Sequence, residues 1–117
     1  FNNGLHSLGT DPTTWANSLR QVLKTIRARQ PQAKIVWCTS TPLKDPSKTA
    51  VVKKLNAAAA EVIKDPALGV VAVDDLFSLL DPLDRKANWS DVYHHKPPTV
   101  DKEAAQVAAS VLNVLGK

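Results

Sequence analysis

At the centre of the chain stands Ala33-Lys34-Ile35-Val36-Trp37-Cys38-Thr39, a run nearly continuous in apolar and β-branched residues. Such a run is typical of a strand buried on both faces of a parallel sheet. It passes into the polar segment Ser40-Thr41-Pro42-Leu43-Lys44-Asp45-Pro46, which we expect to form the loop at the strand's carboxyl end. Because open α/β sheets bind ligands outside the carboxyl ends of their strands, this loop marks one side of an expected site.

Helices are predicted before and after this strand. Asp11-Pro12 is a strong helix start, because aspartate caps the first turn and proline lacks an N–H that would be unpaired there anyway. This helix should run to about Arg29, with an apolar stripe of Trp15, Leu19, Val22, Leu23 and Ile26. A second helix should end near Asp65-Pro66, with Val52, Leu55, Ala59, Val62 and Ile63 on one face.

The second half of the chain repeats the alternation. Gly69 to Val73 is predicted to form a short buried strand, and Asp74-Asp75 are interpreted as helix N-caps. Residues 81–98 contain three prolines among clustered polar residues, which predicts a long loop. The last helix should pack on the sheet through Ala104, Val107, Ala108, Val111, Leu112 and Leu115. Strands alternating with helices indicate an α/β fold of parallel βαβ units, with helices layered on both sides.

Length and composition limit the functional classes. The 117 residues suffice for one domain, and the net charge of +4 is spread along a chain with 5% aromatic residues, so we expect no nucleic-acid partner. No apolar run has transmembrane length. The single cysteine, Cys38, excludes a disulfide within the chain, and we interpret it as a buried small hydrophobe. The four glycines form no phosphate-binding loop, so we expect no nucleotide and no other cofactor.

The segment Trp89-Ser90-Asp91-Val92-Tyr93-His94-His95 places an aspartate three residues before a histidine. In an Asp/His/Ser hydrolase the histidine accepts the serine proton and the aspartate fixes the tautomer and orientation of the imidazole. A gap of three residues allows this contact within one loop. Trp15 and Trp37 fit core positions, whereas Trp89 lies beside the proposed pair, where it would line a pocket.

These residues carry a resemblance to a known family. Phe1-Asn2-Asn3-Gly4-Leu5-His6-Ser7-Leu8, then Thr39-Ser40-Thr41-Pro42 and finally Asp91-Val92-Tyr93-His94 resemble the later part of the SGNH (GDSL-type) esterase and lipase family. The resemblance covers nearly the whole chain. It implies a three-layer α/β/α flavodoxin-like domain with a parallel sheet, a nucleophilic serine in an early Gly-Asp-Ser motif, and a closing Asp-x-x-His pair.

The resemblance also assigns roles to residues. Asp91 would be the orienting carboxylate and His94 the general base. Gly4-Leu5-His6-Ser7 stands where the family usually has Gly-x-Asn-Asp, so His6 takes the oxyanion-donor position and Asn2 is a nearby alternative. Two positions depart from the family pattern, because His6 replaces asparagine and Ser7 replaces aspartate. One branch of the family has a similar Asn-x-Gly-Leu-His segment.

The larger departure is that the Gly-Asp-Ser motif is absent. None of the serines stands in that context; they are residues 7, 18, 40, 47, 78, 90 and 110. Ser40 is the one at an expected strand end, and we do not assign it as the nucleophile. We therefore expect a single partial domain over residues 1–117, incomplete at its N-terminal side and inactive alone. By resemblance, the substrate would be a small-molecule or carbohydrate ester, and a secreted or periplasmic location would fit.

Other interpretations remain open. The chain would alternatively be a non-catalytic flavodoxin-like binding domain. Asp91 would simply cap a turn, with His94 and His95 as surface residues, and His6 would be a loop histidine bonded to backbone. A zinc site from His6, His94, His95 and a carboxylate is the least favoured, because the three histidines show no compact ligand spacing. Oligomeric state and compartment are left open.

Overall fold

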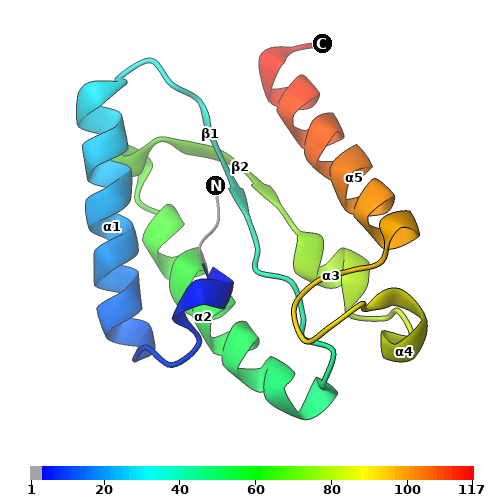
Figure 1. Cartoon of the computed structure of the whole chain (residues 1–117). Helices are drawn as coiled ribbons and strands as arrows, with labels where there is room; N and C mark the ends of the chain where they lie inside the picture. The colour runs from blue at the N-terminus through cyan, green and yellow to red at the C-terminus, as the bar shows by residue number, and fades with distance from the viewer. Residues whose placement is uncertain (1–3) are drawn as a thin grey trace.

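The computed structural model describes residues 4–117, except for the side chain of residue 6. In chain order the elements are η1 (Gly4–Ser7), α1 (Pro12–Arg29), β1 (Ile35–Cys38), η2 (Pro46–Lys48), α2 (Thr49–Ile63), η3 (Pro66–Leu68), β2 (Val70–Asp74), α3 (Leu76–Leu80), α4 (Arg85–Asn88) and α5 (Pro97–Leu115) (Figure 1). Among these elements β1 and β2 pair in parallel as a two-stranded sheet. The predicted α/β class is confirmed at this level. The strand end expected at Phe1 lies outside the described residues.

Helix α1 forms where its capping signals place it. The Asp11 carboxylate accepts a hydrogen bond from the backbone N–H of Thr14 at 3.0 Å, and Pro12 occupies the first helical position. The helix ends at Arg29, two residues before Pro31. Both predicted boundaries are confirmed, because capping and proline geometry act locally.

The core lies between α1, α2 and one face of β1. Leu23 of α1 and Leu55 of α2 are almost fully buried, as is Trp37 of β1. The Trp15 and Trp37 rings meet edge to face, with centroids 6.2 Å apart. Such contacts stabilise a small core through both area burial and ring electrostatics. The predicted core positions of both tryptophans are confirmed.

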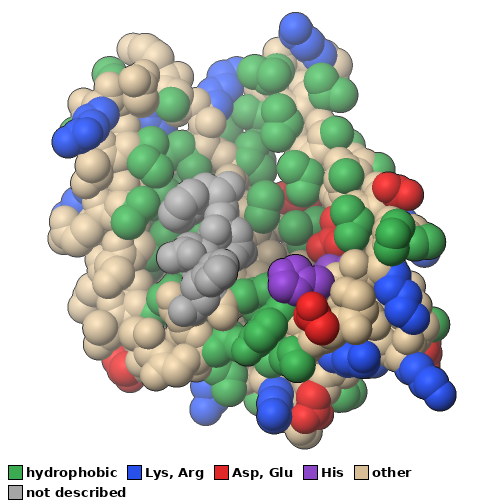
Figure 2. Space-filling model, viewed as in Figure 1, with side chains coloured by type: hydrophobic (Ala, Val, Ile, Leu, Met, Phe, Trp, Pro, Cys, Tyr) green, Lys and Arg blue, Asp and Glu red, His purple; other side chains and the backbone are tan. Residues whose placement is uncertain are grey.

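Helix α5 contacts β2 and β1, but not through the predicted apolar stripe. Val111, Leu112 and Leu115 are exposed, and Figure 2 shows hydrophobic side chains along the surface of this helix. The face turned inward carries Gln106, whose Nε2 donates to Asp74 Oδ1 at 2.6 Å. Asp74 is almost fully buried, and a carboxylate in that position requires a hydrogen-bond partner. The bond to Gln106 therefore turns this polar face of α5 toward the sheet, and the apolar stripe of the helix is left facing outward.

The same bond corrects one capping assignment. Asp74 is not an N-cap; it ends β2 and lies buried against α5. Asp75 is the N-cap of α3, as predicted, and its carboxylate accepts from the backbone N–H of Ser78 at 3.1 Å. Thr39 after β1 donates its hydroxyl to the same capping oxygen, Asp75 Oδ1, at 3.1 Å. The ends of β1 and β2 are thereby tied together.

The predicted long loop over residues 81–98 is wrong in part. Asp84 caps the short helix α4, accepting from the backbone N–H of Ala87 at 2.6 Å. Pro97 and Pro98 do not extend the loop but occupy the first turn of α5, where proline is well tolerated. Within residues 4–117 no helix combines the length and apolar character required to cross a membrane.

Two neighbouring residues of α1 test this account of the core. Leu23→Ala removes a side chain with 0% exposure and should lower the free energy of unfolding by about 2–5 kcal/mol through lost burial and the cavity left behind. Val22→Ala, at a position 41% exposed, should cost about 1 kcal/mol or less. Urea unfolding followed by tryptophan fluorescence measures both. Equal losses at the two positions would contradict the placement of the core.

Candidate functional site

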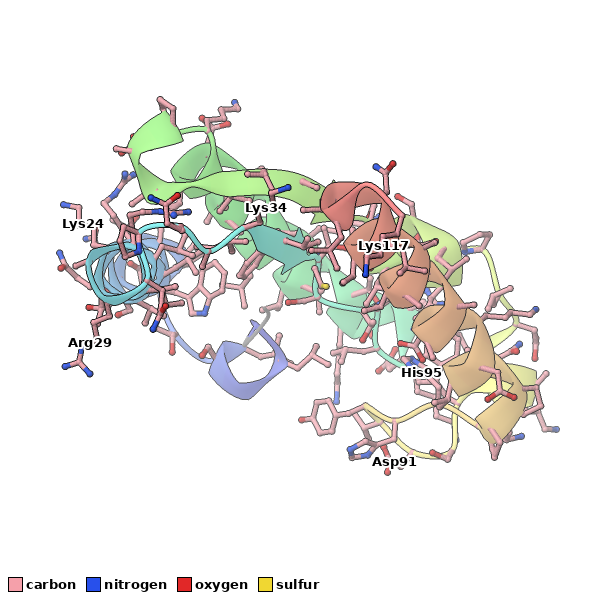
Figure 3. The ribbon with its side chains drawn as sticks, turned by 90° about the horizontal axis from the view of Figure 1, so that it is seen from above. Lys24, Arg29, Lys34, Asp91, His95 and Lys117 are labelled. Atoms are coloured by element: carbon pink, nitrogen blue, oxygen red, sulfur yellow. The ribbon has the colours of Figure 1, made fainter. Side chains whose placement is uncertain are left out.

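The segment of residues 89–96 is held beside the loop that follows β1. The backbone N–H of Lys44 donates to the carbonyl of Val92 at 3.1 Å, and Trp89 Nε1 donates to the carbonyl of Pro42 at 3.2 Å. Figure 3 shows Asp91 at the edge of the molecule and His95 nearer to α5. The segment therefore lies beside the loop at the carboxyl end of β1, the edge at which open α/β sheets bind ligands.

Asp91 and His94 form a hydrogen-bonded pair within this segment. His94 Nδ1 lies 2.8 Å from Asp91 Oδ2, while Asp91 Oδ1 accepts from the backbone N–H groups of Tyr93 and His94, each at 2.8 Å. Because an ionised carboxylate can only accept, His94 Nδ1 must carry the proton of this bond. In the neutral ring Nε2 then holds a lone pair, which is the arrangement of the base and its orienting acid in a hydrolase triad.

The electrostatics of Asp91 follow from the same contacts. The backbone N–H of His94, then that of Tyr93 and then the His94 ring hold the pKa of Asp91 at about 2, below its ordinary value of 3.8. Asp91 is therefore ionised at neutral pH. Its side chain is 57% exposed and that of His94 is 77% exposed, so both are accessible to a substrate.

The alternative interpretation of Asp91 as a turn cap is also realised. Its Oδ1 atom closes the turn at Tyr93 and His94, and its Oδ2 atom holds the ring. The two roles do not compete, since each uses a different carboxylate oxygen. The turn bonds fix the carboxylate, and the fixed carboxylate then orients the imidazole.

His95 is not the surface residue of the alternative interpretation. Its side chain is 6% exposed, and its Nδ1 lies 2.8 Å from Glu103 Oε2 of α5. His94 and His95 thus bind two different carboxylates. Among the residues that the structure describes, no group of three or more His, Cys, Asp or Glu side chains is placed to hold a metal ion.

The predicted oxyanion side is only partly visible. Asn2 lies outside the described residues, and so does the side chain of His6; the backbone at Gly4 begins the 3₁₀-helix η1. The roles of these three residues therefore stay predictions.

Two serines near the site have structural contacts. Ser40 is 2% exposed, and its backbone N–H and carbonyl both bind the side-chain amide of Asn56, at 2.8 and 2.9 Å. Ser90 Oγ donates to the backbone carbonyl of His94 at 3.0 Å and not to its ring. Burial raises the pKa of the Cys38 thiol, which disfavours its reactive thiolate form. The burial of Ser40 supports the prediction that it is not the nucleophile.

Trp89, which we expected beside the proposed pair, is a buried residue, and its pocket-lining role stays a prediction. It is 1% exposed, and its ring packs edge to face against His95, with centroids 4.7 Å apart. The Arg85 guanidinium lies over the same indole, 4.5 Å from its centroid. Neither Arg85 nor Glu103 carries a recognisable sequence signal, because each meets its partner only in the folded chain.

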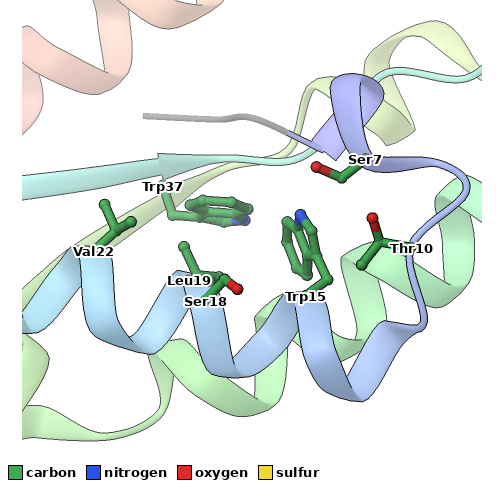
Figure 4. A pocket seen from close by; sticks show the side chains of 7 residues that line it. All are labelled: Ser7, Thr10, Trp15, Ser18, Leu19, Val22 and Trp37. Atoms are coloured by element: carbon green, nitrogen blue, oxygen red, sulfur yellow. The ribbon is translucent and has the colours of Figure 1, made fainter.

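A pocket of about 150 Å³ opens between α1 and β1 (Figure 4). It is lined by Ser7, Thr10, Trp15, Ser18, Leu19, Val22 and Trp37. Two of its walls are the indoles of the core, and hydroxyl groups stand at its edge. Neither Asp91 nor His94 is among the residues that line it, so this pocket is distinct from the proposed site.

No protein-family model, curated protein sequence or solved structure matches the chain. The resemblance to the SGNH family therefore rests on the residues themselves.

The pKa of Asp91 provides a test of this geometry. Because the folded-state pKa is depressed, the stabilisation from the ionised carboxylate is present above the ordinary value of 3.8 and is lost as the pH falls through about 2. The ¹³Cγ resonance of Asp91 should titrate near pH 2. His94→Ala should keep most of the depression, because the backbone N–H groups contribute most to it. A midpoint near 3.8 in the unmodified chain would contradict the geometry.

Proposed function

We propose that residues 1–117 are the C-terminal part of an SGNH-type serine ester hydrolase, to which Asp91 and His94 contribute the base and its orienting acid. The observation that carries the proposal is the 2.8 Å contact between His94 Nδ1 and Asp91 Oδ2 on an imidazole that is 77% exposed. A histidine held in this tautomer, with the opposite nitrogen available, is suited to general base catalysis.

The arrangement of elements supports the flavodoxin-like part of the proposal. Trp37 of β1 packs toward α1 and α2, and Asp74 of β2 is bonded to Gln106 of α5. A parallel strand pair with helices packed in this manner fits the later part of a three-layer α/β/α domain. The proposed site then lies where such folds bind ligands, beyond the carboxyl end of β1.

In the proposed reaction the nucleophile is a serine that residues 1–117 do not contain, since the Gly-Asp-Ser motif is missing from them. Its Oγ attacks the ester carbonyl carbon while His94 Nε2 accepts the hydroxyl proton. The C=O electrons move to oxygen, and the resulting oxyanion requires donors, a role proposed for Asn2, Gly4 and His6. Collapse of this intermediate expels the alcohol, which takes the proton from His94. Water then hydrolyses the acyl-serine by the same steps.

Asp91 supports both proton transfers. It is ionised at neutral pH, because its pKa lies at about 2, and it faces the ring that becomes positive when Nε2 is protonated. Exposure lets water screen this attraction, so we expect it to strengthen when bound substrate covers the pair.

The proposed substrate is an acyl ester of a carbohydrate or another small alcohol. The exposed imidazole supports this, because a base near the surface can serve an ester whose alcohol part is bulky. The proposal needs no metal and no cofactor for its chemistry.

Ester hydrolysis by the complete gene product tests the function. With p-nitrophenyl acetate, His94→Ala should lower kcat/KM by about 10³-fold or more, because the triad acts as a unit. Asp91→Asn should cost about 10²- to 10⁴-fold through loss of the correct tautomer. Lys102→Ala, an exposed position on α5, is the matched control and should retain full activity.

Two outcomes would contradict the proposal. Undiminished hydrolysis by His94→Ala would exclude the base role, and a complete product without esterase activity would favour the non-catalytic binding domain. Residues 1–117 alone are a second control, and we expect no turnover from them. A turnover by this chain that His94→Ala abolishes would place the nucleophile among its own serines.

A further inference from the structure

The two adjacent histidines point in opposite directions. The His94 side chain is 77% exposed, whereas that of His95 is 6% exposed. The His95 ring packs edge to face against Trp89, at an interplanar angle of 81°. One imidazole thus faces solvent and its neighbour faces the interior.

The backbone explains this opposition. Trp89 and His95 form an antiparallel bridge, flanked by the bonds Ser90 N–H to His94 O and Lys96 N–H to Asn88 O, both 2.9 Å. In paired extended backbone, successive side chains point to opposite faces. Burying the ring of His95 therefore directs the ring of His94 outward, on the side of Asp91.

Glu103 provides the contact that holds His95 inward. Its Oε2 atom lies 2.8 Å from His95 Nδ1, and its side chain is only 17% exposed. His95 Nε2 is buried and has no hydrogen-bond partner among the described residues. Without Glu103 both ring nitrogens would be buried and unpaired, and a buried polar group in that state is strongly disfavoured.

We infer that Glu103 and His95 form a positioning pair, which fixes the outward orientation of His94 toward Asp91 from the far side of the backbone. The His95 side chain is buried and that of Glu103 is mostly covered, so neither residue is placed to touch substrate. The Glu103–His95 hydrogen bond and the peptide unit between His95 and His94 connect α5 to the Asp91–His94 pair. The importance of this pair for catalysis rests on the proposed function, whereas its effect on the orientation of His94 does not.

The remaining contacts of the segment allow the bond to be removed without unfolding the site. Trp89 is also held by Pro42 and by Arg85, and Arg85 is itself paired with Asp81 at 2.6 Å. Thr99 of α5 donates its hydroxyl to Asn88 Oδ1 at 2.8 Å, so the residue that directly precedes the segment is also bonded to this helix. Loss of Glu103 should therefore release His95 specifically.

The test uses the 117-residue chain with ¹⁵N-labelled histidine, in which long-range ¹H–¹⁵N spectra report the tautomer of each ring. At a pH where imidazole is neutral, His94 should be mainly the Nδ1–H form. Glu103→Ala should lower this excess, because the inward anchor of the neighbouring residue is lost while the Asp91 turn remains. Glu103→Gln should restore it, because the amide oxygen can still accept from His95 Nδ1. Val62→Ala in the buried core of α2 is a control for destabilisation alone and should leave the His94 tautomer unchanged.

An unchanged His94 tautomer in Glu103→Ala would overturn the inference, as would an equal change in Val62→Ala. This readout needs no substrate and no nucleophile. A positive tautomer result in a chain whose complete product lacks esterase activity would retain the positioning pair and reject the proposed function. An unchanged His94 tautomer in Glu103→Ala, together with hydrolysis that depends on His94, would reject the positioning pair and retain the proposed function.

Discussion

The burial of one indole, that of Trp89, organises the part of the molecule that carries the proposed chemistry. Its Nε1–H reaches back to the carbonyl of Pro42 after β1, its backbone pairs with His95, and its ring packs against that imidazole. An aromatic ring with a polar edge can fill a core and still form a specific hydrogen bond. Through these contacts a segment late in the chain is joined both to the end of the first strand and to the last helix.

The polar groups around this indole divide into an inner and an outer pair. The inner pair is mostly covered, with His95 6% and Glu103 17% exposed, and acts as an anchor, whereas Asp91 and His94 are exposed and available for reaction. In both pairs the carboxylate contacts Nδ1 of the imidazole, so Nε2 is the ring nitrogen that the carboxylate does not occupy. The difference in exposure separates their roles, because a buried nitrogen cannot reach a substrate and an exposed one can.

Features set by local chemistry were predictable from the sequence. The Asp11 cap, the existence of the two strands and the Asp91–His94 spacing each depend on a few neighbouring residues. The predicted burial of the second strand is wrong, because Val71 and Val73 of β2 are exposed. The face of α5 that packs was not predictable, because it depends on a bond between Gln106 and Asp74, 32 positions apart. The inward turn of His95 likewise depends on Glu103. Helix α4 was missed because its four residues give no periodicity, although Asp84 provides a capping signal.

The most direct test of the base role of Asp91 and His94 is the site of reaction with a fluorophosphonate, which phosphonylates an activated serine. The complete gene product would be treated and the modified residue identified by mass spectrometry. The proposed function predicts one modified serine outside residues 1–117, in a Gly-Asp-Ser context, and loss of the modification in His94→Ala. A serine modified equally in the presence and absence of His94 would contradict it, as would a product that does not react.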